Sequence, residues 1–261
     1  MKIIISPAKK MNIREDELDW ADLPCFLSRA EELKTYIQSL DRLEARQLWQ
    51  CNEKIAELNY GRFRDMDLTR RLTPALLSYE GIQYQYMAPG VFEQAQWDYA
   101  QEHLRILSGF YGLLRPLDGI RPYRLEMQAK IALPSGIRSL YDYWGRSLYE
   151  ELAREETVVV NLASREYSKA IEPYLEPHIT YITCVFGSLK EDSKENTKVT
   201  VKATEAKMAR GEMVRFMAEH QVEEPEALKG FRGLGYSYCG RLSGEREYVF
   251  LKKAHSHEDG V

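Results

Sequence analysis

Two short apolar runs, lying far apart in the chain, constrain its fold more than any other sequence feature. Lys2–Ile5 contains three consecutive isoleucines and ends at Ser6-Pro7, and Thr157–Leu162 is apolar over most of its length. Apolar runs of this length are typical of strands that are buried within a sheet. We therefore expect both segments to be core strands.

Helical periodicity dominates the first half of the chain. Apolar residues recur at spacings of three and four over 27–40, which predicts an amphipathic helix. A second helix is predicted from Asp41, which begins a capping box, and its buried stripe runs from Leu43 to Leu58. A third helix is predicted over 97–107.

Strands become more frequent in the second half. Residues 179–189 and 197–204 bracket a polar turn at 190–196, which is the pattern of a hairpin with a long loop. A helix over 203–220 follows, and 247–252 is predicted to be the last strand. These elements alternate between helical and extended patterns rather than repeating one unit.

The fold class predicted from these elements is mixed α/β (α+β). We expect a central mixed sheet, helices around it and a C-terminal hairpin. Because no Pro/Gly-rich linker and no repeat divides the chain, residues 1–254 are expected to form a single domain. Residues 255–261 are expected to be a frayed tail.

The composition argues against several classes of protein. Hydrophobic residues make up 44% of the chain and charged residues 29%, which indicates a folded protein rather than a disordered one. No stretch approaches the roughly 20 apolar residues that cross a bilayer, and the N-terminal run is too short for a signal peptide. We expect no membrane contact and a cytoplasmic location. The four cysteines are isolated and the five histidines are few, so no metal site and no cofactor are expected.

The charge distribution leaves room for an anion-binding patch. A net charge of -4 and a pI near 5.9 argue against a protein that binds nucleic acid over its whole surface. Basic residues nevertheless exceed acidic ones over 103–130 and 227–253. A local excess of this kind can steer an anion toward one part of the surface.

The first group of candidate residues follows the first apolar run. Ser6 and Lys9 lie in the loop just after Lys2–Ile5. Open α/β sheets bind ligands where loops leave the carboxyl ends of strands. A hydroxyl and an ammonium group on such a loop suit a phosphate or a carboxylate. The alternative is a plain exposed loop.

The densest group of candidate residues comprises Arg105, Ser108, Gly109, Gly112, Arg115, Arg121 and Arg124. Arginine presents a planar fork of donors that matches a phosphate bidentately. Gly109 and Gly112 interrupt a helical pattern, and glycine lets a backbone approach a ligand closely. The alternative is that the arginines pair with the local acids Asp118 and Glu126.

The third group, Asn161, Ser164 and Glu166, lies at the end of the second apolar run. Ser164 is well placed to be the N-cap of a following helix, which is a purely structural role. Capping does not explain Asn161 or Glu166, and these two would supply the polar floor of a cleft. We expect this loop to lie beside the loop that carries Ser6, because both follow the carboxyl ends of core strands.

The fourth group lies on the predicted helix over 203–220. Lys207, Gly211 and Arg215 are spaced four apart and share one strip of the helix, and Arg210 adjoins them. Glycine inside a helix costs about 1 kcal/mol relative to alanine, so Gly211 needs a reason. Close approach of an anionic ligand is one reason, and close packing of another helix is the other.

Five motifs that include these groups resemble the YaaA family of bacterial proteins: ISPAK at 5–9, LRILSGFYGLLRPLDGIRPYRLEM at 104–127, YDYWG at 141–145, VVVNLASREY at 158–167 and KMARG at 207–211. The match runs in order over nearly the whole chain, and only the tail lies outside it. The second motif is long enough to be highly specific.

The resemblance implies a cytosolic protein of the peroxide stress response that limits free intracellular iron and iron-driven damage to DNA. It also implies binding of double-stranded DNA through a helix-hairpin-helix element, whose Gly-containing turn presents backbone N–H groups to a phosphate. In this sequence the best candidate for that turn is 107–112. The predicted basic surface combines Arg105, Arg115, Arg121, Arg124, Lys207 and Arg215.

Two alternatives to a DNA-binding protein stay open at this point. One is an enzyme that acts on a small phosphorylated or nucleotide-like substrate in the same cleft, with Glu166 as the candidate general base. The other is direct iron binding, for which no cluster of ligands has the required spacing. The sequence contains no P-loop, no dinucleotide-binding glycine motif, no nucleophile elbow and no H-E-x-x-H.

Overall fold

The two apolar runs form neighbouring strands in the middle of the sheet, as predicted. In a computed structural model that describes residues 1–14, 18–154, 156–191 and 197–252, β1 (Lys2–Ile5) pairs in parallel with β8 (Val158–Leu162). Ile5 lies opposite Leu162, so the two strands end at the same level. All four residues of β1 are buried, which explains the unbroken apolar sequence.

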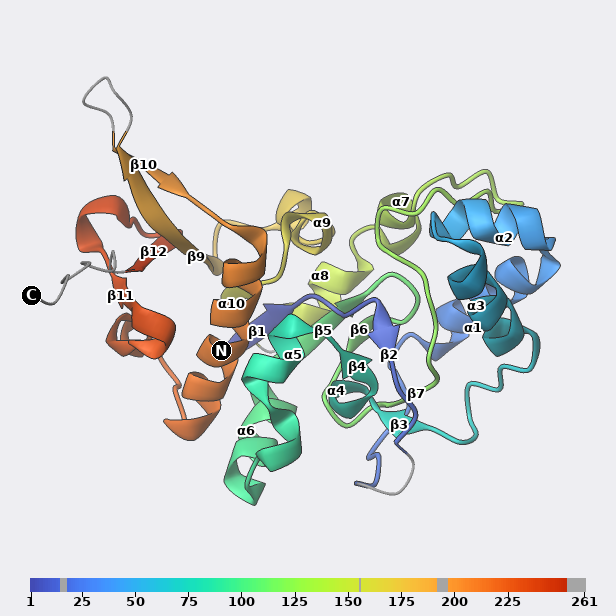
Figure 1. Cartoon of the computed structure of the whole chain (residues 1–261), viewed down its shortest axis with the longest axis horizontal. Helices are drawn as coiled ribbons and strands as arrows, with labels where there is room; N and C mark the ends of the chain where they lie inside the picture. The colour runs from blue at the N-terminus through green and yellow to red at the C-terminus, as the bar shows by residue number, and fades with distance from the viewer. Residues whose placement is uncertain (15–17, 155, 192–196, 253–261) are drawn as a thin grey trace, which may run out of the picture.

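The described residues form an eight-stranded mixed sheet around this pair (Figure 1). Parallel pairing joins β12, β9, β8, β1 and β5, and antiparallel strands lie at both edges. The order is β11 (Tyr236–Tyr238), β12 (Glu247–Lys252), β9 (Thr180–Glu191), β8, β1, β5 (Leu104–Ser108) and β6 (Gly112–Leu114), and β10 (Thr197–Thr200) pairs with β9 alone. Two small ribbons add β2 (Lys10–Met11) with β4 (Tyr79–Glu80) and β3 (Thr73–Pro74) with β7 (Gly119–Ile120).

The order of the strands reverses direction between β1 and β8. The chain passes from β1 to β5 on one side, then crosses to β8 on the other side and continues to β9. Such a topological switch point leaves a crevice outside the carboxyl ends of the two strands. The loops that carry Ser6 and Ser164 begin at this point.

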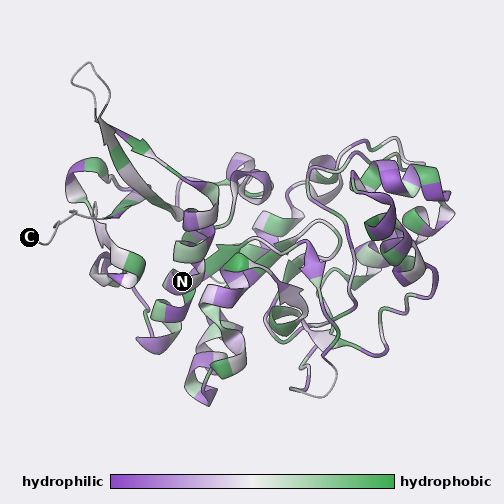
Figure 2. Ribbon diagram, in the orientation of Figure 1, coloured by the Kyte–Doolittle hydropathy of each residue, from purple (hydrophilic) through white to green (hydrophobic). Residues whose placement is uncertain are grey.

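Helices flank the sheet and extend the molecule at one end. Figure 1 places α1–α3 together beyond β6, whereas α10 lies beside α5 near β1. Figure 2 shows hydrophobic colour concentrated on the central strands and hydrophilic colour on the outer helix surfaces.

The α-helices are α1 (Leu27–Ser39), α2 (Arg42–Trp49), α3 (Glu53–Arg64), α4 (Ala75–Ser78), α5 (Ile82–Met87), α6 (Gln94–His103), α7 (Leu140–Trp144), α8 (Ser147–Leu152), α9 (Arg165–Ser168) and α10 (Ala203–Glu219). The 3₁₀ turns are η1 (Pro89–Val91), η2 (Glu172–Tyr174), η3 (Pro225–Gly230), η4 (Gly233–Gly235) and η5 (Gly240–Leu242).

The predicted second helix is two helices. The capping box is confirmed, because the Asp41 side chain accepts from the backbone of Glu44 and the Glu44 side chain accepts from the backbone of Asp41. The helix then ends at Gln50, which has a left-handed φ of 45°, and α3 begins after the Asn52 cap. The stripe predicted from Leu43 to Leu58 is therefore wrong at both ends, where these side chains are 62% and 55% exposed.

The predicted helix over 97–107 is also wrong in its second half. Helix α6 ends at His103, and residues 104–108 form strand β5, which pairs in parallel with β1. A short apolar run has the same pattern in a buried helix and in a buried strand. Pairing with β1 decides between them, because it satisfies the backbone groups of a segment whose five residues are all buried.

The predicted C-terminal hairpin is confirmed. Strands β9 and β10 pair in an antiparallel manner and project from the body of the molecule (Figure 1). The second strand ends at Thr200 rather than at residue 204, and α10 begins at Ala203. The first two residues of the turn predicted at 190–196 belong to β9, whereas 192–196 and the predicted tail at 255–261 lie outside the described residues. Among the residues that are described, no helix is both long enough and apolar enough to cross a bilayer.

Candidate functional site

A cleft of about 400 Å³ lies at the crevice between β1 and β8. Its walls come from segments that are far apart in the sequence. They are the loop at 6–10, the segment 80–84 at the start of α5, the loop at 123–126, residues 164, 166 and 167 at the start of α9, and Lys207 and Arg210 of α10. The four groups of candidate residues thus each contribute part of one site.

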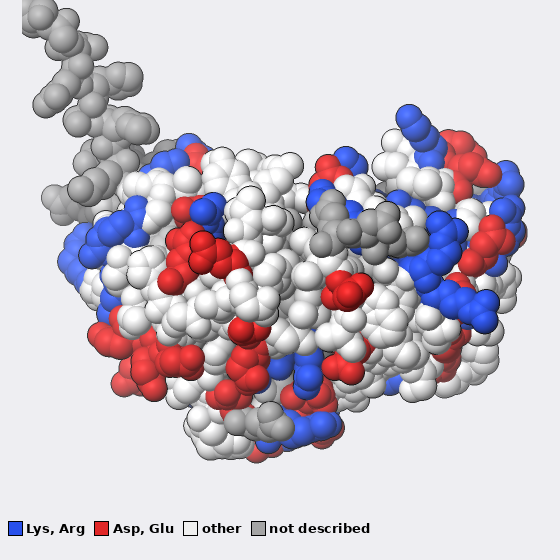
Figure 3. Space-filling model, turned by 90° about the horizontal axis from the view of Figure 1, so that it is seen from below, with Lys and Arg blue, Asp and Glu red and all other residues white. Residues whose placement is uncertain are grey.

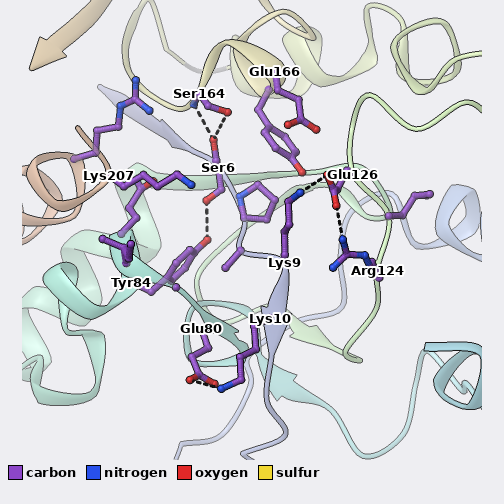
Figure 4. A pocket seen from close by; sticks show the side chains of 18 of the residues that line it. Ser6, Lys9, Lys10, Glu80, Tyr84, Arg124, Glu126, Ser164, Glu166 and Lys207 are labelled. Carbon is purple, nitrogen blue, oxygen red and sulfur yellow. Dashed lines mark hydrogen bonds and ion pairs between the residues drawn. The ribbon is translucent and has the colours of Figure 1, made fainter. Parts of the chain in front are cut away.

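Direct hydrogen bonds join the two loops that follow the core strands. The Ser6 hydroxyl accepts a hydrogen bond from the backbone N–H of Ser164 at 2.8 Å and lies 3.2 Å from the Ser164 hydroxyl. The Tyr84 hydroxyl donates to the backbone carbonyl of Ser6 at 3.0 Å. The predicted proximity of these loops is therefore confirmed, and Figure 4 shows the resulting chain from Ser164 through Ser6 to Tyr84.

Cationic side chains of α10 form one side of the cleft. Lys207 is exposed and extends toward Ser6 (Figure 4). Arg210 is half-buried, and burial lowers the pKa of its guanidinium. Among the described residues, Arg210 makes no ion pair and its Nε atom has no hydrogen-bond partner. Because a buried charge without a partner is costly, this guanidinium is suited to an anion that enters the cleft.

Carboxylates lie on the other side of the Ser164–Ser6–Tyr84 chain (Figure 4). Glu126 forms ion pairs with Lys9 Nζ at 2.8 Å and with Arg124 Nη2 at 2.9 Å. The pairing of the arginines with local acids is thus confirmed for Arg124. At the rim, Lys10 Nζ pairs with Glu80 at 2.6 Å.

Glu166 is the carboxylate of the cleft that has no cation within ion-pair distance among the described residues. Its Oε1 atom lies 3.4 Å from the backbone N–H of Gln128, and the Tyr141 hydroxyl donates to its backbone carbonyl. Burial raises the pKa of Glu166, and the charge of Glu126 raises it further. These are features of a carboxylate that can accept a hydrogen bond or a proton from a ligand.

Three candidate residues have structural roles, and two of them, Arg105 and Asn161, do not line the cleft. Arg105 is 8% exposed in the middle of β5, where its Nη1 atom donates to the carbonyls of Gln101 and Leu104. Asn161 is 3% exposed and accepts from the backbone of Ala163. Ser164 holds the N-cap position of α9, but its hydroxyl makes no cap hydrogen bond.

The turn at 107–112 is a β-turn between β5 and β6, so the placement of a helix-hairpin-helix element there is wrong. The Ser108 hydroxyl is fully buried and accepts from the backbone N–H groups of Phe110 and Tyr111. A Cβ atom on Gly109 would lie 2.5 Å from the Leu125 carbonyl, and Gly112 has a φ of 78°. These glycines permit the turn and its packing rather than the approach of a ligand.

The remaining arginines each make a local contact. The backbone of Arg115 donates to Asp118, Arg121 donates to the carbonyl of Arg71, and Arg215 pairs with Glu219 at 2.7 Å. Figure 3, which views the molecule from below the orientation of Figure 1, shows acidic and basic side chains interspersed over much of the visible surface. Because Arg105 is buried, it cannot belong to the predicted basic surface, and a surface formed by the other members with Lys207 stays a prediction.

Comparison with known proteins agrees with the family resemblance that the sequence motifs indicated. A model of the family described as peroxide stress protein YaaA matches residues 1–242. The chain belongs to this family. A UPF0246 protein of Agathobacter rectalis is 50% identical over 253 residues, which cover 97% of this chain and 99% of the relative. A UPF0246 protein of Desulfitobacterium hafniense is 52% identical and one of Pediococcus pentosaceus is 48% identical, each over 97% of this chain and 98% of the relative. Family membership supports a role in the peroxide stress response.

Gly211 of this YaaA-family chain is explained by helix packing. A Cβ atom at this position would lie 2.1 Å from the backbone carbonyl oxygen of Gln83 and 3.0 Å from the backbone nitrogen of Met87. Helix α5 therefore approaches α10 too closely for any other residue. The packing alternative is correct, and it brings the start of α5 into the wall of the cleft.

Sequence reasoning missed the contribution of α5 to the site. Gln83 and Tyr84 line the cleft, although no motif of charge or glycine spacing distinguishes their segment. The Nε2 atom of Gln83 is buried and has no hydrogen-bond partner among the described residues. The only signal for this segment in the sequence is indirect, namely that Gly211 calls for a close neighbour.

A second hollow of the YaaA-family chain, of about 650 Å³, is lined by residues of α3, the segment after it and Arg121. Its cationic lining residues are Arg62, Arg64, Arg70, Arg71 and Arg121, and we call it the arginine hollow. Arg64 pairs with Asp65 and Arg70 with Asp67. The loop that supplies Arg121 to this hollow supplies Arg124 to the cleft, so one short segment borders both.

Proposed function

We propose that this chain acts in the peroxide stress response by binding double-stranded DNA through phosphate contacts in the cleft and the arginine hollow. The observation that supports this most is that one loop, 121–126, contributes an arginine to each of two hollows lined by cationic side chains. A single small anion fills one such hollow, whereas a ligand that reaches both carries several negative charges. Duplex DNA is such a polyanion, with one charge per about 1.7 Å of its axis.

Each hollow has a cation arrangement that suits a phosphate. Arg210 and Lys207 are one turn apart on α10, and Arg210 has no acidic partner among the described residues. In the arginine hollow the partly exposed guanidiniums pair with acids on the surface, and exchange of such a weak pair for a phosphate costs little. Charge-assisted contacts of arginine to phosphate are among the stronger hydrogen bonds.

The proposal predicts that variants in the two hollows weaken the binding of one DNA molecule in a similar way. Fluorescence anisotropy with a labelled duplex of 20 base pairs measures the affinity of the full chain. Replacing Lys207 and Arg210 by Gln and Met, or Arg64 and Arg70 by Gln, should each weaken binding, and the combination should weaken it further. Replacing Lys169 and Lys198 by Gln removes the same charge from exposed sites that do not line either hollow.

The outcomes separate the proposal from its rivals. Similar losses for both pairs of variants, with little change in the control, support a polyanion that spans the hollows. Loss only for the variants of Lys207 and Arg210 would contradict a spanning ligand. An equal loss for the control would mean that the affinity reflects net charge alone.

A second candidate function is an enzyme that acts on a small phosphorylated or nucleotide-like substrate. The observation that favours it is the unpaired carboxylate of Glu166, whose pKa is raised, in a cleft of about 400 Å³. Ligand sites for small molecules have volumes of about 300–1,000 Å³. Turnover of a phosphorylated compound that falls by about 10²-fold or more in Glu166→Gln, with unchanged binding, would favour this function.

We include in the proposal the limitation of free intracellular iron, which in turn limits iron-driven damage to DNA, and we assign it to the same site. Free iron and survival under peroxide can be measured in cells that carry either the wild-type chain or the variant in which Lys207 and Arg210 are replaced. Loss of both effects together would support one site. An unchanged iron level with lost survival would separate iron limitation from the cleft.

A further inference from the structure

The cleft is larger and chemically more varied than a phosphate requires. Its volume of about 400 Å³ lies in the range of sites for small organic ligands. Partly exposed apolar groups of Pro7, Ala8 and Ile82 also line it. A phosphate bound at Lys207 and Arg210 leaves this apolar surface and the opposite wall uncovered.

Buried polar atoms without partners are concentrated in this site. Among the described residues, five buried side-chain nitrogen or oxygen atoms have no hydrogen-bond partner, and those of Gln83, Arg124 and Arg210 belong to residues that line the cleft. Buried polar groups in folded proteins almost always have partners. The concentration of exceptions here is expected if a bound ligand completes the hydrogen bonding of these walls.

The charges of the cleft are separated across the Ser164–Ser6–Tyr84 chain. Lys207 lies on one side of this chain, and Glu126 and Glu166 lie on the other (Figure 4). Glu126 is neutralised by Lys9 and Arg124, whereas Glu166 has no ion pair among the described residues. An ionised carboxylate only accepts hydrogen bonds and repels a phosphate. The part of a ligand that reaches Glu166 must therefore donate hydrogen bonds.

We propose that the cleft binds one nucleotide unit, with its phosphate at Lys207 and Arg210 and a donor group of its base at Glu166. This inference rests on the proposed function, because it uses the same phosphate contacts. Glu and Asp accept a hydrogen bond from the exocyclic amino group of cytosine in nucleic-acid recognition. Adenine and guanine also carry an exocyclic amino group, and thymine has a ring N3–H, so each base offers a donor to Glu166. The apolar groups between the two ends cover the sugar and the face of the base.

The nucleotide unit can come from two sources that share this chemistry. A free nucleoside monophosphate enters the cleft directly. A nucleotide of DNA enters only after it leaves the base stack, because a paired base in a duplex is not accessible to a cleft of this size. Unstacking costs a few kcal/mol for a paired base and least for an unpaired one. A DNA source therefore predicts a preference for duplexes that contain an unpaired nucleotide.

Calorimetric titration of the full chain with defined probes tests the inference. The probes are inorganic phosphate, deoxyribose 5-phosphate and the monophosphates of deoxyadenosine, deoxycytidine, deoxyguanosine and thymidine. At least one of the four nucleotides should bind about tenfold more tightly than inorganic phosphate and than deoxyribose 5-phosphate, which has no base, since one good base contact contributes about 1–3 kcal/mol. Glu166→Gln should reduce this advantage, and Arg210→Met should weaken all probes.

Equal affinity for all six probes would overturn the inference, because the cleft would then bind only the phosphate. Retention of the tenfold advantage in Glu166→Gln would also overturn the placement of the base. Thermal unfolding of each variant confirms that it is folded, and Arg210→Lys provides a second variant that keeps the charge and loses the planar fork.

Labelled duplexes, with and without one unpaired nucleotide, separate the sources and the two proposals. Tighter binding of the duplex with the unpaired nucleotide, together with competition by the favoured monophosphate, indicates DNA as the source. Nucleotide binding without duplex binding would support this inference and refute the proposed function. Salt-dependent duplex binding, with monophosphates no better than inorganic phosphate, would support the proposed function and refute this inference.

Discussion

Replacement of Gly211 by alanine is expected to destabilise the protein, although the same change usually stabilises a helix. The added Cβ atom would lie 2.1 Å from the backbone carbonyl oxygen of Gln83. Alanine is favoured over glycine in a helix by about 1 kcal/mol, but overpacking costs about 1–3 kcal/mol, and a backbone neighbour cannot rotate away. We expect the overpacking cost to exceed the propensity gain, giving a net loss of up to about 2 kcal/mol.

The matched control is Gly61→Ala in α3, where an added Cβ atom meets nothing within 4 Å. Thermal unfolding should show a melting temperature that falls by up to about 8 °C for Gly211→Ala and rises by up to about 4 °C for Gly61→Ala. Stabilisation by Gly211→Ala similar to that of the control would refute the helix-packing explanation. The ligand-approach explanation would then be restored.

Three further variants test other parts of the structure. Burial raises the pKa of Asp118 to about 7, above its usual value, so the folded state gains stability as the pH falls from about 7 toward 4. Asp118→Asn keeps an acceptor for the backbone N–H of Arg115. In urea unfolding at pH 8 this variant should be more stable than the wild-type chain by up to about 4 kcal/mol, and near pH 4 it should have no advantage. Equal stability of the two proteins at pH 8 would contradict this. Ser6→Ala removes the acceptor for Ser164 N–H and should cost about 1–3 kcal/mol in the same assay, whereas no cost would mean that water replaces the hydroxyl. Glu166→Gln should leave the affinity for a fully paired duplex equal or tighter, because no paired base reaches Glu166 and the change removes a negative charge from a phosphate site; weaker binding of that duplex in an anisotropy titration would refute this.

The centre of the fold could be predicted from the sequence because its signals are local and strong. The apolar runs at 2–5 and 157–162 have few interpretations other than buried strands. The rule that ligands bind at the carboxyl ends of such strands then places Ser6 beside Ser164, and their hydrogen bond bears this out. The capping box at Asp41 is equally local.

Features that depend on tertiary contacts could not be predicted in this way. Residues 104–108 are compatible with helix and strand, and only their neighbour β1 decides between the two. Arg105 is buried because that strand lies within the sheet, whereas its charge alone suggested an exposed binding residue. Gln83 belongs to the cleft through the close contact of α5 with α10, which no local pattern specifies.

The central claim, that Lys207 and Arg210 bind DNA phosphates, is tested most directly by the salt dependence of duplex affinity. Each phosphate contact contributes a slope of about -0.9 to the logarithm of the binding constant against the logarithm of salt concentration. Anisotropy titrations between about 50 and 200 mM salt should therefore give a slope that is shallower by about 2 for Lys207→Gln/Arg210→Met than for the wild-type chain. The control in which Lys169 and Lys198 are replaced should keep the wild-type slope. A double variant that is folded and retains the wild-type slope would contradict the claim.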